Sequence, residues 1–423
     1  MTTRREWLRQ QRRRKYGKYR GPFIALGILA GLAALGGLVF LAWRFVILRL
    51  PHGEKEPEVK ELFIASENSV SEAEAVSDNE AETEQELFSK AEWKKEHDPV
   101  KGIYVTGPVA GSERMEELVT LLDSTELNAM VIDVKNDAGE VTFQLPEEMK
   151  AAQMGNCVRY IRDPEEMLAG LKEHGIITIA RIVCFKDPLL AEAAPELALL
   201  DAAGNPVTDG KDLAWVNPCS REVWDYLIEL ACYSADLGFD EIQFDYVRFP
   251  VGAGTEDASY GTELTEENKH EFITDFLSDA AAAVHDKKVP LTADLFGTVI
   301  GNPTDVGKVG QDYVELASAV DALCPMIYPS HYGNGVFGLD VPDAAPHDTV
   351  LAALTLSSTE LSEIPEDECA VVRPWLQDFT ATWVNGHISY GEEQVREQIR
   401  AVEEAGYREW ILWNARNHYS LTE

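Results

Sequence analysis

Short apolar runs alternate with amphipathic segments from residue 101 to the C-terminal end of the chain. Runs rich in β-branched residues, such as 176–184, are typical of buried strands. Segments such as 221–237, in which apolar residues recur every three or four positions, are typical of helices packed by one face. The pattern predicts eight strands, at 102–105, 128–134, 176–184, 241–247, 291–295, 321–328, 370–376 and 409–413, with a further strand-like run at 141–145. It predicts helices at 112–124, 164–174, 187–200, 221–237, 266–285, 310–319, 345–361 and 392–405.

Eight strand–helix units over residues 101–423 match a (β/α)8 TIM barrel in number and in length. A doubly wound open sheet is the alternative. However, no G-x-G-x-x-G motif follows the first predicted strand, and eight regular units favour closure. We therefore expect an α/β protein whose residues 99–423 form a TIM barrel.

A basic segment and then an apolar segment precede this domain. Residues 1–20 hold nine Lys or Arg, and residues 21–43 hold no charged side chain. At ~1.5 Å per residue, a helix of that length spans about 34 Å, enough to cross a hydrocarbon core of roughly 30 Å. It is too long for the apolar part of a cleaved signal peptide, and positive residues stay on the cytoplasmic side. The sequence predicts a cytoplasmic tail (1–20), one transmembrane helix (21–43) and an extracytoplasmic remainder. A core helix behind an N-terminal tail is the alternative.

The segment 44–98 is rich in Glu, Ala and Ser, and we expect it to form an acidic disordered stalk. Residues 1–50 carry a net charge of +10, so the remainder carries −46. Such an acidic body does not bind nucleic acid through phosphate contacts, and it favours neutral or cationic partners.

The six cysteines form no C-x-x-C pair and have no His at zinc-ligand spacing, so we expect no metal centre and no cofactor. Cys184 and Cys324 lie in apolar runs and are predicted to be core residues.

The stretch 240–250, D-E-I-Q-F-D-Y-V-R-F-P, places Asp245 in an apolar run near the end of the fourth predicted strand. Burial of an unpaired carboxylate costs several kcal/mol, so Asp245 must be paired or must face a wet cleft. A structural ion pair with Arg248 is one explanation. The other is a catalytic carboxylate, because TIM-barrel chemistry gathers at the C-terminal ends of the strands.

Most of the other predicted strands also end in polar or aromatic residues, without a phosphate loop, a cofactor fingerprint or a G-x-S-x-G motif. These residues are Asp133, Lys135, Asn136 and Asp137; Arg181, Lys186 and Asp187; Asp294; Tyr328, Ser330, His331 and Tyr332; Arg373, Trp375, Gln377 and Asp378; and Trp413, Asn414 and Arg416.

Carboxylates, aromatic residues and amides suit the cleavage of a glycosidic bond, which needs two carboxyl groups and, in our interpretation, surfaces for sugar rings. Asp245 as nucleophile and Asp294 as proton donor form the best pair, on adjacent strands, and Asp133 could replace Asp294. Arginines at positions 181 and 248 would keep Asp245 ionised. The predicted substrate-binding residues are Asp133, Lys135, Arg181, Arg248, Tyr328, His331, Trp375, Gln377 and Trp413. An ion pair between Asp133 and Lys135, and a Trp that only plugs the barrel, are equally compatible with the sequence.

Several motifs resemble a bacterial family of domains of unknown function that are classed as glycosidase-type TIM barrels. They are K-G-I-Y-V-T at 101–106, A-M-V-I-D-V-K-N-D-A-G at 129–139, F-D-Y-V-R-F-P at 244–250, T-A-D-L-F-G at 292–297 and C-P-M-I-Y-P-S-H-Y at 324–332. The resemblance covers about 100–420, and the family is distantly similar to the α-amylase and α-galactosidase group. It implies that Asp245 is the nucleophile. Amylase-like enzymes usually place a Glu after strand five, where this sequence has Asp294.

The residues and the resemblance together predict a membrane-anchored, extracytoplasmic glycoside hydrolase that acts on a cell-envelope or environmental polysaccharide, with retention of configuration. One alternative is a barrel that binds polysaccharide without cleaving it. Another is a divalent-metal hydrolase, which would need Asp133, Asp137, Asp245 and Asp294 to converge on one point.

Overall fold

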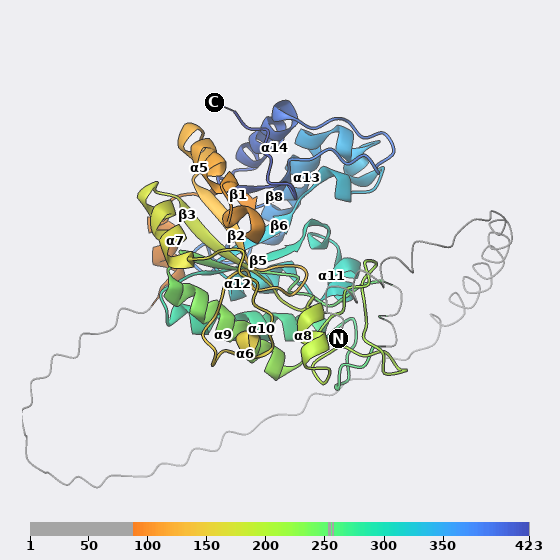
Figure 1. Ribbon diagram of the computed structural model, residues 1–423. Coiled ribbons are helices and arrows are strands. Elements are labelled where there is room, and N and C mark those ends of the chain that lie inside the picture. Colours follow the sequence, from red (N-terminus) through yellow and green to blue (C-terminus); the bar gives the residue numbers. More distant parts are fainter. Residues whose placement is uncertain (1–87, 253–254, 256–257, 423) are drawn as a thin grey trace, which may run out of the picture. The chain divides into compact units, whose positions relative to one another are not determined.

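The computed structural model describes residues 88–252, 255 and 258–422, and in that part of the chain nine parallel strands form one closed sheet (Figure 1). The strands are β1 (Lys101–Val105), β2 (Ala129–Lys135), β3 (Ile177–Val183), β4 (Glu241–Asp245), β5 (Leu291–Phe296), β6 (Ala322–Met326), β7 (Val371–Val372), β8 (Trp375–Gln377) and β9 (Trp410–Trp413). Consecutive strands pair from β1 to β6, and β9 returns to β1.

The seventh position of the barrel is shared by β7 and β8, which both pair with β6. Arg373 and Pro374 separate them, and proline interrupts a strand because it has no N–H to donate. Counted this way, the sheet has eight positions, and the predicted TIM barrel is confirmed.

Helices surround the sheet and follow the predicted order (Figure 1). The longer ones are α5 (Arg114–Ser124), α7 (Pro164–Glu173), α9 (Arg221–Leu237), α10 (Lys269–His285), α13 (Pro346–Glu360) and α14 (Glu392–Glu404). The shorter ones are α4 (Gly107–Ala110), α6 (Lys150–Gln153), α8 (Pro188–Ala193), α11 (Pro303–Val309) and α12 (Tyr313–Ala319), with single 3-10 turns at 297–299, 329–331, 336–338 and 342–344. Helix α9 packs its apolar face on β3 and β4 and ends at Gly238, whose φ of 110° is one that glycine adopts readily.

Two hydrophobic cores follow from the strand alternation. Side chains such as Val131, Ile179 and Cys324 fill the barrel, and a larger set packs between the strands and the helices. In β4 the Phe244 ring stacks on Phe276 of α10, with 5.4 Å between ring centroids. Because Phe244 faces outward, its neighbours in the strand face the barrel interior. Cys184 and Cys324 are fully buried, as predicted.

Two predicted elements differ in the structure. The run 141–145 is not a strand but part of the loop after β2, in which Val141 makes only isolated bridges, to Lys135 and Cys157. The helix predicted at 187–200 covers only Pro188–Ala193, because Pro195 cannot continue it. The chain then makes a hairpin-like excursion in which Ala198 is bridged to Val216.

The predicted tail (1–20) and transmembrane helix (21–43) lie outside the described residues. None of the helices in the described ranges is long and apolar enough to span a membrane. The predicted stalk (44–98) is corrected at its end, where α3 (Lys90–Glu96) is helical and packs on the barrel. Lys90 donates to the Ser318 carbonyl at 3.0 Å and Lys94 to the Cys369 carbonyl at 2.8 Å. Both carbonyls lie just before strands, so α3 covers the N-terminal face of the barrel.

Arg373 lies at this same face, not at the C-terminal end where the sequence placed it. Its Nη1 donates to Glu241 at 2.6 Å and its Nε to Glu409 at 2.8 Å. The imidazole of His97, just after α3, lies 2.6 Å from the other oxygen of Glu409. The Arg373 side chain is fully buried, so one guanidinium forms ion pairs with two carboxylates inside the barrel.

We expect Arg373→Met to lower the free energy of unfolding by about 3–5 kcal/mol, because it leaves Glu241 and Glu409 buried without their cation. Urea unfolding of residues 88–423 at pH 7 measures the loss. The triple variant that also carries Glu241→Gln and Glu409→Gln should recover part of it. A loss below about 1 kcal/mol for the single variant would contradict the assigned role.

Candidate active site

The C-terminal end of the barrel gathers inward-facing polar side chains from neighbouring strands. Asp133 of β2 is paired in register with Arg181 of β3, and Arg181 with Gln243 of β4. The β4–β5 pairing runs to Phe244 and Ala293, so one further step places Asp245 beside Asp294. Neighbouring strands lie about 4.8 Å apart, and the structure therefore brings the predicted carboxylates into one cluster.

Arg181 is the centre of this cluster. Its Nη1 donates to Asp133 Oδ1 at 2.5 Å, and its Nε and Nη2 donate to Asp245 Oδ2 at 3.0 and 2.5 Å. Nη2 also donates to Asp137 Oδ1 at 3.2 Å. Since the Arg181 side chain is only 1% exposed, a single buried cation holds three carboxylates from two strands and one loop.

The three carboxylates share one positive charge unequally. Burial raises the pKa of Asp133 to about 6, and this effect exceeds the opposing effects of Arg181 and of the Tyr104 hydroxyl, which donates at 2.6 Å. For Asp137, whose side chain is 43% exposed, burial also acts to raise the pKa, but the charges of Arg181 and Lys186 outweigh it and lower the pKa.

Asp294 has a different environment. No Lys, Arg or His among the described residues lies within ion-pair distance of it. Its Oδ1 accepts from Gln243 at 2.8 Å and from the Trp375 indole at 2.6 Å. Burial and, next, the charge of Asp245 raise its pKa well above the ordinary value. Asp294 is also the more deeply buried of the two carboxyls, with 1% of its surface exposed, against 7% for Asp245.

The chain turns sharply directly after Asp245. Tyr246 has a φ of 51°, which is unfavourable for a residue other than glycine, and its backbone N–H donates to Asp245 Oδ1 at 2.5 Å. The Tyr246 hydroxyl donates to Asp137 Oδ2 at 3.3 Å, and Lys186 Nζ lies 4.6 Å from the centre of its ring. The turn thus fixes the Asp245 carboxylate from its own backbone while Arg181 binds its other oxygen.

Aromatic rings surround the carboxylates. Trp413, half-buried, stacks on Tyr104 at 4.2 Å and lies edge-on to Trp375 at 5.6 Å. Tyr328 is buried, and the exposed His331 lies edge-on to it at 4.9 Å. The charges of Asp294 and Asp245 act on Tyr328, whose pKa burial raises first, so this ring belongs to the same cluster.

Two predicted substrate-binding residues, Lys135 and Gln377, are engaged elsewhere. Lys135 follows a register shift in β2, is fully buried, and donates to Asp187 at 2.9 Å rather than to Asp133. Gln377 is fully buried and links Ser330, Asp343 and Phe379. Neither of the two carries an exposed group toward the carboxylates.

Arg248 forms no ion pair with Asp245, so the structural explanation considered for that pair is wrong. Its guanidinium lies 4.5 Å from the ring centre of Phe296, 4.8 Å from Trp215 and 5.4 Å from Tyr246, and burial lowers its pKa to about 10. Cation–π contacts with three rings hold it beside the fourth strand.

The sequence reasoning missed Tyr104 and Gln243, which hold Asp133 and Asp294. Both lie on the inward side of their strands, and strand parity counted from Asp245 would have found Gln243. Trp215 was missed because it comes from the excursion after α8, which was predicted as part of a helix and a loop. No local signal ties it to Arg248.

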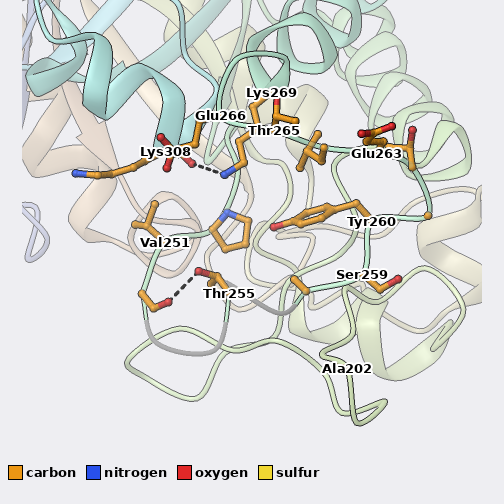
Figure 2. A pocket seen from close by; sticks show the side chains of 16 residues that line it. Ala202, Val251, Thr255, Ser259, Tyr260, Glu263, Thr265, Glu266, Lys269 and Lys308 are labelled. Atoms are coloured by element: carbon orange, nitrogen blue, oxygen red, sulfur yellow. Dashed lines mark hydrogen bonds between the residues drawn. The ribbon is translucent and has the colours of Figure 1, made fainter. Parts of the chain in front are cut away.

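Three of the four carboxylates that a metal hydrolase would need, those of Asp133, Asp137 and Asp245, meet at the Arg181 guanidinium instead. The fourth, Asp294, accepts hydrogen bonds from two neutral side chains. Within the described ranges, no three His, Cys, Asp or Glu side chains are arranged to hold a metal ion. A wide groove of about 1160 Å³ lies apart from this cluster, and Figure 2 shows its walls, among them Tyr260, Lys269 and Lys308. None of the predicted site residues lines it.

The raised pKa of Asp133 predicts a pH dependence of stability. The folded protein binds a proton at Asp133 more tightly than the unfolded chain does. The protonated carboxyl therefore adds to the free energy of unfolding at low pH, and this stabilisation is lost as the pH rises through about 6. Between pH 5 and pH 7.5, the stability of the wild type relative to Asp133→Asn should fall by about 1.4 kcal/mol. Urea unfolding of both proteins across this range measures it. A difference that rises with pH would show instead that Arg181 lowers this pKa.

Comparisons with known proteins agree with the barrel. The glycoside hydrolase domain of PgaB (BpsB) from Bordetella bronchiseptica is 13% identical over 75% of this chain and 94% of that one, with a TM-score of 0.56. A β-galactosidase from the psychrophilic Marinomonas ef1 is 12% identical over 74% of this chain and 53% of that one, with a TM-score of 0.51. At these identities the similarity shows a shared fold.

A hypothetical protein from Ruminiclostridium thermocellum ATCC 27405 is 36% identical, over 45% of this chain and 96% of that one, with a TM-score of 0.40. No match was found among curated proteins. Residues 102–419 match the family model described as "Putative glycosyl hydrolase domain". Because this match spans the barrel from β1 past β9, about three quarters of the sequence, the chain belongs to that glycosyl hydrolase family.

Proposed function

We propose that this chain is a membrane-anchored, extracytoplasmic glycoside hydrolase that cleaves O-glycosidic bonds in a cell-envelope or environmental polysaccharide. One observation carries the proposal. Asp245 lies beside Asp294 at the C-terminal end of the barrel, and the two carboxyl groups have opposite environments: Arg181 pairs with the first, and burial raises the pKa of the second. Glycoside cleavage requires two carboxyl groups with different roles, one of which donates a proton.

The proposed reaction begins with the Asp245 carboxylate, which attacks the anomeric carbon. Asp294 donates its proton to the leaving glycosidic oxygen, so the C–O bond breaks as a glycosyl–Asp245 ester forms. A water that loses a proton to the Asp294 carboxylate then hydrolyses the ester and restores both groups. The adjacent positions of the two residues support the short carboxyl spacing, about 5–5.5 Å, that retention requires.

Substrate contacts are proposed for the remaining residues at this end of the barrel. The half-buried Trp413 and the exposed His331 are placed to meet a sugar, and Tyr328 and Trp375 form the wall behind them. Asp133 and Arg181 position Asp245. Lys135 and Gln377, which the sequence suggested as substrate contacts, are proposed to act only through the loops they hold.

The membrane anchor is proposed from the sequence. The uncharged segment 21–43 after a basic tail supports a single span with a cytoplasmic N-terminus. Helix α3 contacts the N-terminal face of the barrel, and the carboxylate cluster lies at the opposite face.

The burial of Asp294 favours a second candidate, a barrel that binds polysaccharide without cleaving it. A proton donor must contact the glycosidic oxygen, and only 1% of the Asp294 surface is exposed. The two candidates share the binding surface and differ in whether Asp294 acts on substrate, so turnover separates them.

Asp245→Asn should abolish hydrolysis, with a loss on the order of 10³-fold or more, because the amide cannot form the glycosyl ester. The measurement is turnover of a panel of 4-nitrophenyl glycosides and polysaccharides, together with a melting curve. Asp123→Asn, at a surface site with 45% side-chain exposure, is the matched control and should keep full activity. Undiminished cleavage by a normally folded Asp245→Asn protein would overturn the assignment.

The activity that Asp294→Asn loses should depend on how readily the leaving group of the substrate departs without a proton. Removal of a general acid typically costs about 10²–10⁴-fold. The loss should be large for a poor leaving group such as a sugar and small for 4-nitrophenolate, which departs without a proton. Equal losses for both kinds of substrate would remove Asp294 from this role. An active enzyme that is unaffected by the change would point to another acid at the rim.

A further inference from the structure

Trp383 stands out on the surface of the domain. It is 67% exposed, more than any other large hydrophobic side chain of the described residues. It lies in the loop 378–391, which joins β8 to α14 at the C-terminal end of the barrel. A single exposed apolar residue is common on soluble proteins. The exposure of Trp383 is of interest because of the aromatic rings that lie beneath it.

A series of rings connects Trp383 to the carboxylate cluster. Trp383 stacks on Phe379, with 6.0 Å between centroids and an interplanar angle of 21°. Phe379, half-buried, lies edge-on to Tyr328 at 5.9 Å, and the charges of Asp294 and Asp245 act on Tyr328. Two ring-to-ring contacts therefore separate the proposed reaction centre from a flat aromatic face in solvent.

The loop that carries Trp383 is held at both ends. Gln377 donates to the Phe379 carbonyl at 3.0 Å. Tyr390 donates from its backbone to Thr380 at 3.0 Å and from its hydroxyl to the Asp343 carbonyl at 3.0 Å. A platform that is already ordered costs little conformational entropy when a ligand binds to it.

The chemistry of this loop indicates the class of ligand. Residues 379–390 contain no Asp, Glu, Lys or Arg, although residues 51–423 carry a net charge of −46. The exposed side chains around Trp383 are uncharged amide and hydroxyl groups, on Thr382, Asn385 and Ser389, with His387 nearby. A flat apolar face bordered by neutral hydrogen-bonding groups matches a pyranose ring, which has apolar C–H faces and hydroxyls at its edge.

We infer that the loop 379–390 is an outer glycan subsite, in which Trp383 stacks on a neutral sugar of the same chain that passes the Asp245–Asp294 pair. This inference rests on the proposed function and adds a substrate class to it. Because Phe379 and Tyr328 lie between Trp383 and the carboxylates, the subsite engages a sugar beyond the one nearest the cleaved bond. The substrate is thus a neutral chain of several sugars.

The test is binding without turnover, in the Asp245→Asn variant of the full chain. Titration calorimetry is run with neutral oligosaccharide ladders of one to six sugars, built from glucose, galactose or N-acetylglucosamine. In at least one ladder, affinity should grow with chain length. Trp383→Ala should weaken the longest member at least tenfold and leave the disaccharide unchanged, and Trp383→Phe should recover most of the affinity.

Trp93→Ala is the matched control, since Trp93 also stacks on a neighbouring ring, His97, but at the N-terminal face. It should leave every affinity unchanged. Affinity that does not grow with length in any ladder would overturn the inference, as would equal losses for short and long sugars. So would a smaller assembly of Trp383→Ala in light scattering, which would mean that Trp383 pairs two copies of the chain.

The outcomes separate this inference from the proposed function. If the wild type fails to cleave but binding still grows with length and depends on Trp383, the hydrolase proposal fails and the subsite stands. If cleavage depends on Asp245 but Trp383→Ala changes neither long-chain binding nor long-chain turnover, the hydrolase stands and the subsite fails.

Discussion

The ion cluster of Arg181 is the interaction on which the candidate site depends. A single guanidinium, almost fully buried, binds carboxylates from β2, from β4 and from the loop after β2. Without it, Asp133 and Asp245 would be two buried negative charges on either side of one strand, an arrangement that costs several kcal/mol. The planar donors of arginine suit this task, because they contact several oxygens in fixed directions. The position of Asp245 is therefore determined by a neighbouring strand as much as by its own.

The barrel repeats this solution at its other end. Arg373 pairs with Glu241 and Glu409 near the N-terminal face, where His97 continues the network toward α3. Asp294 lies at the C-terminal end, beside the Arg181 cluster, without a cation in contact among the described residues. Its two neutral donors, Gln243 and Trp375, stabilise the carboxyl group but cannot replace a positive charge. Asp245 and Asp294 therefore differ in environment because a cation contacts the first carboxyl and not the second.

The functional proposal combines this asymmetry with membership of a glycosyl hydrolase family. This proposal requires that substrate reach Asp294, whose pKa burial raises and which is the more deeply buried of the two carboxyls. The aromatic series that runs from Tyr328 to Trp383 indicates how a glycan would approach the pair. An acidic surface interrupted by an uncharged aromatic loop favours a neutral polymer over an anionic one.

The sequence by itself determined the barrel, because eight apolar runs separated by helical periods allow few other closed arrangements. The sequence also placed Asp245 and Asp294 at strand ends, since a strand end can be recognised where polar residues follow an apolar run. The tertiary structure alone decided the partners. Arg248 follows Asp245 closely in sequence yet contacts aromatic rings, whereas Arg181, 64 positions away, binds it. Lys135 forms an ion pair with Asp187 and not with Asp133, because a register shift in β2 changes the direction of the Lys135 side chain. Partner choice depends on strand register and loop paths, which bring distant residues together and leave no local pattern.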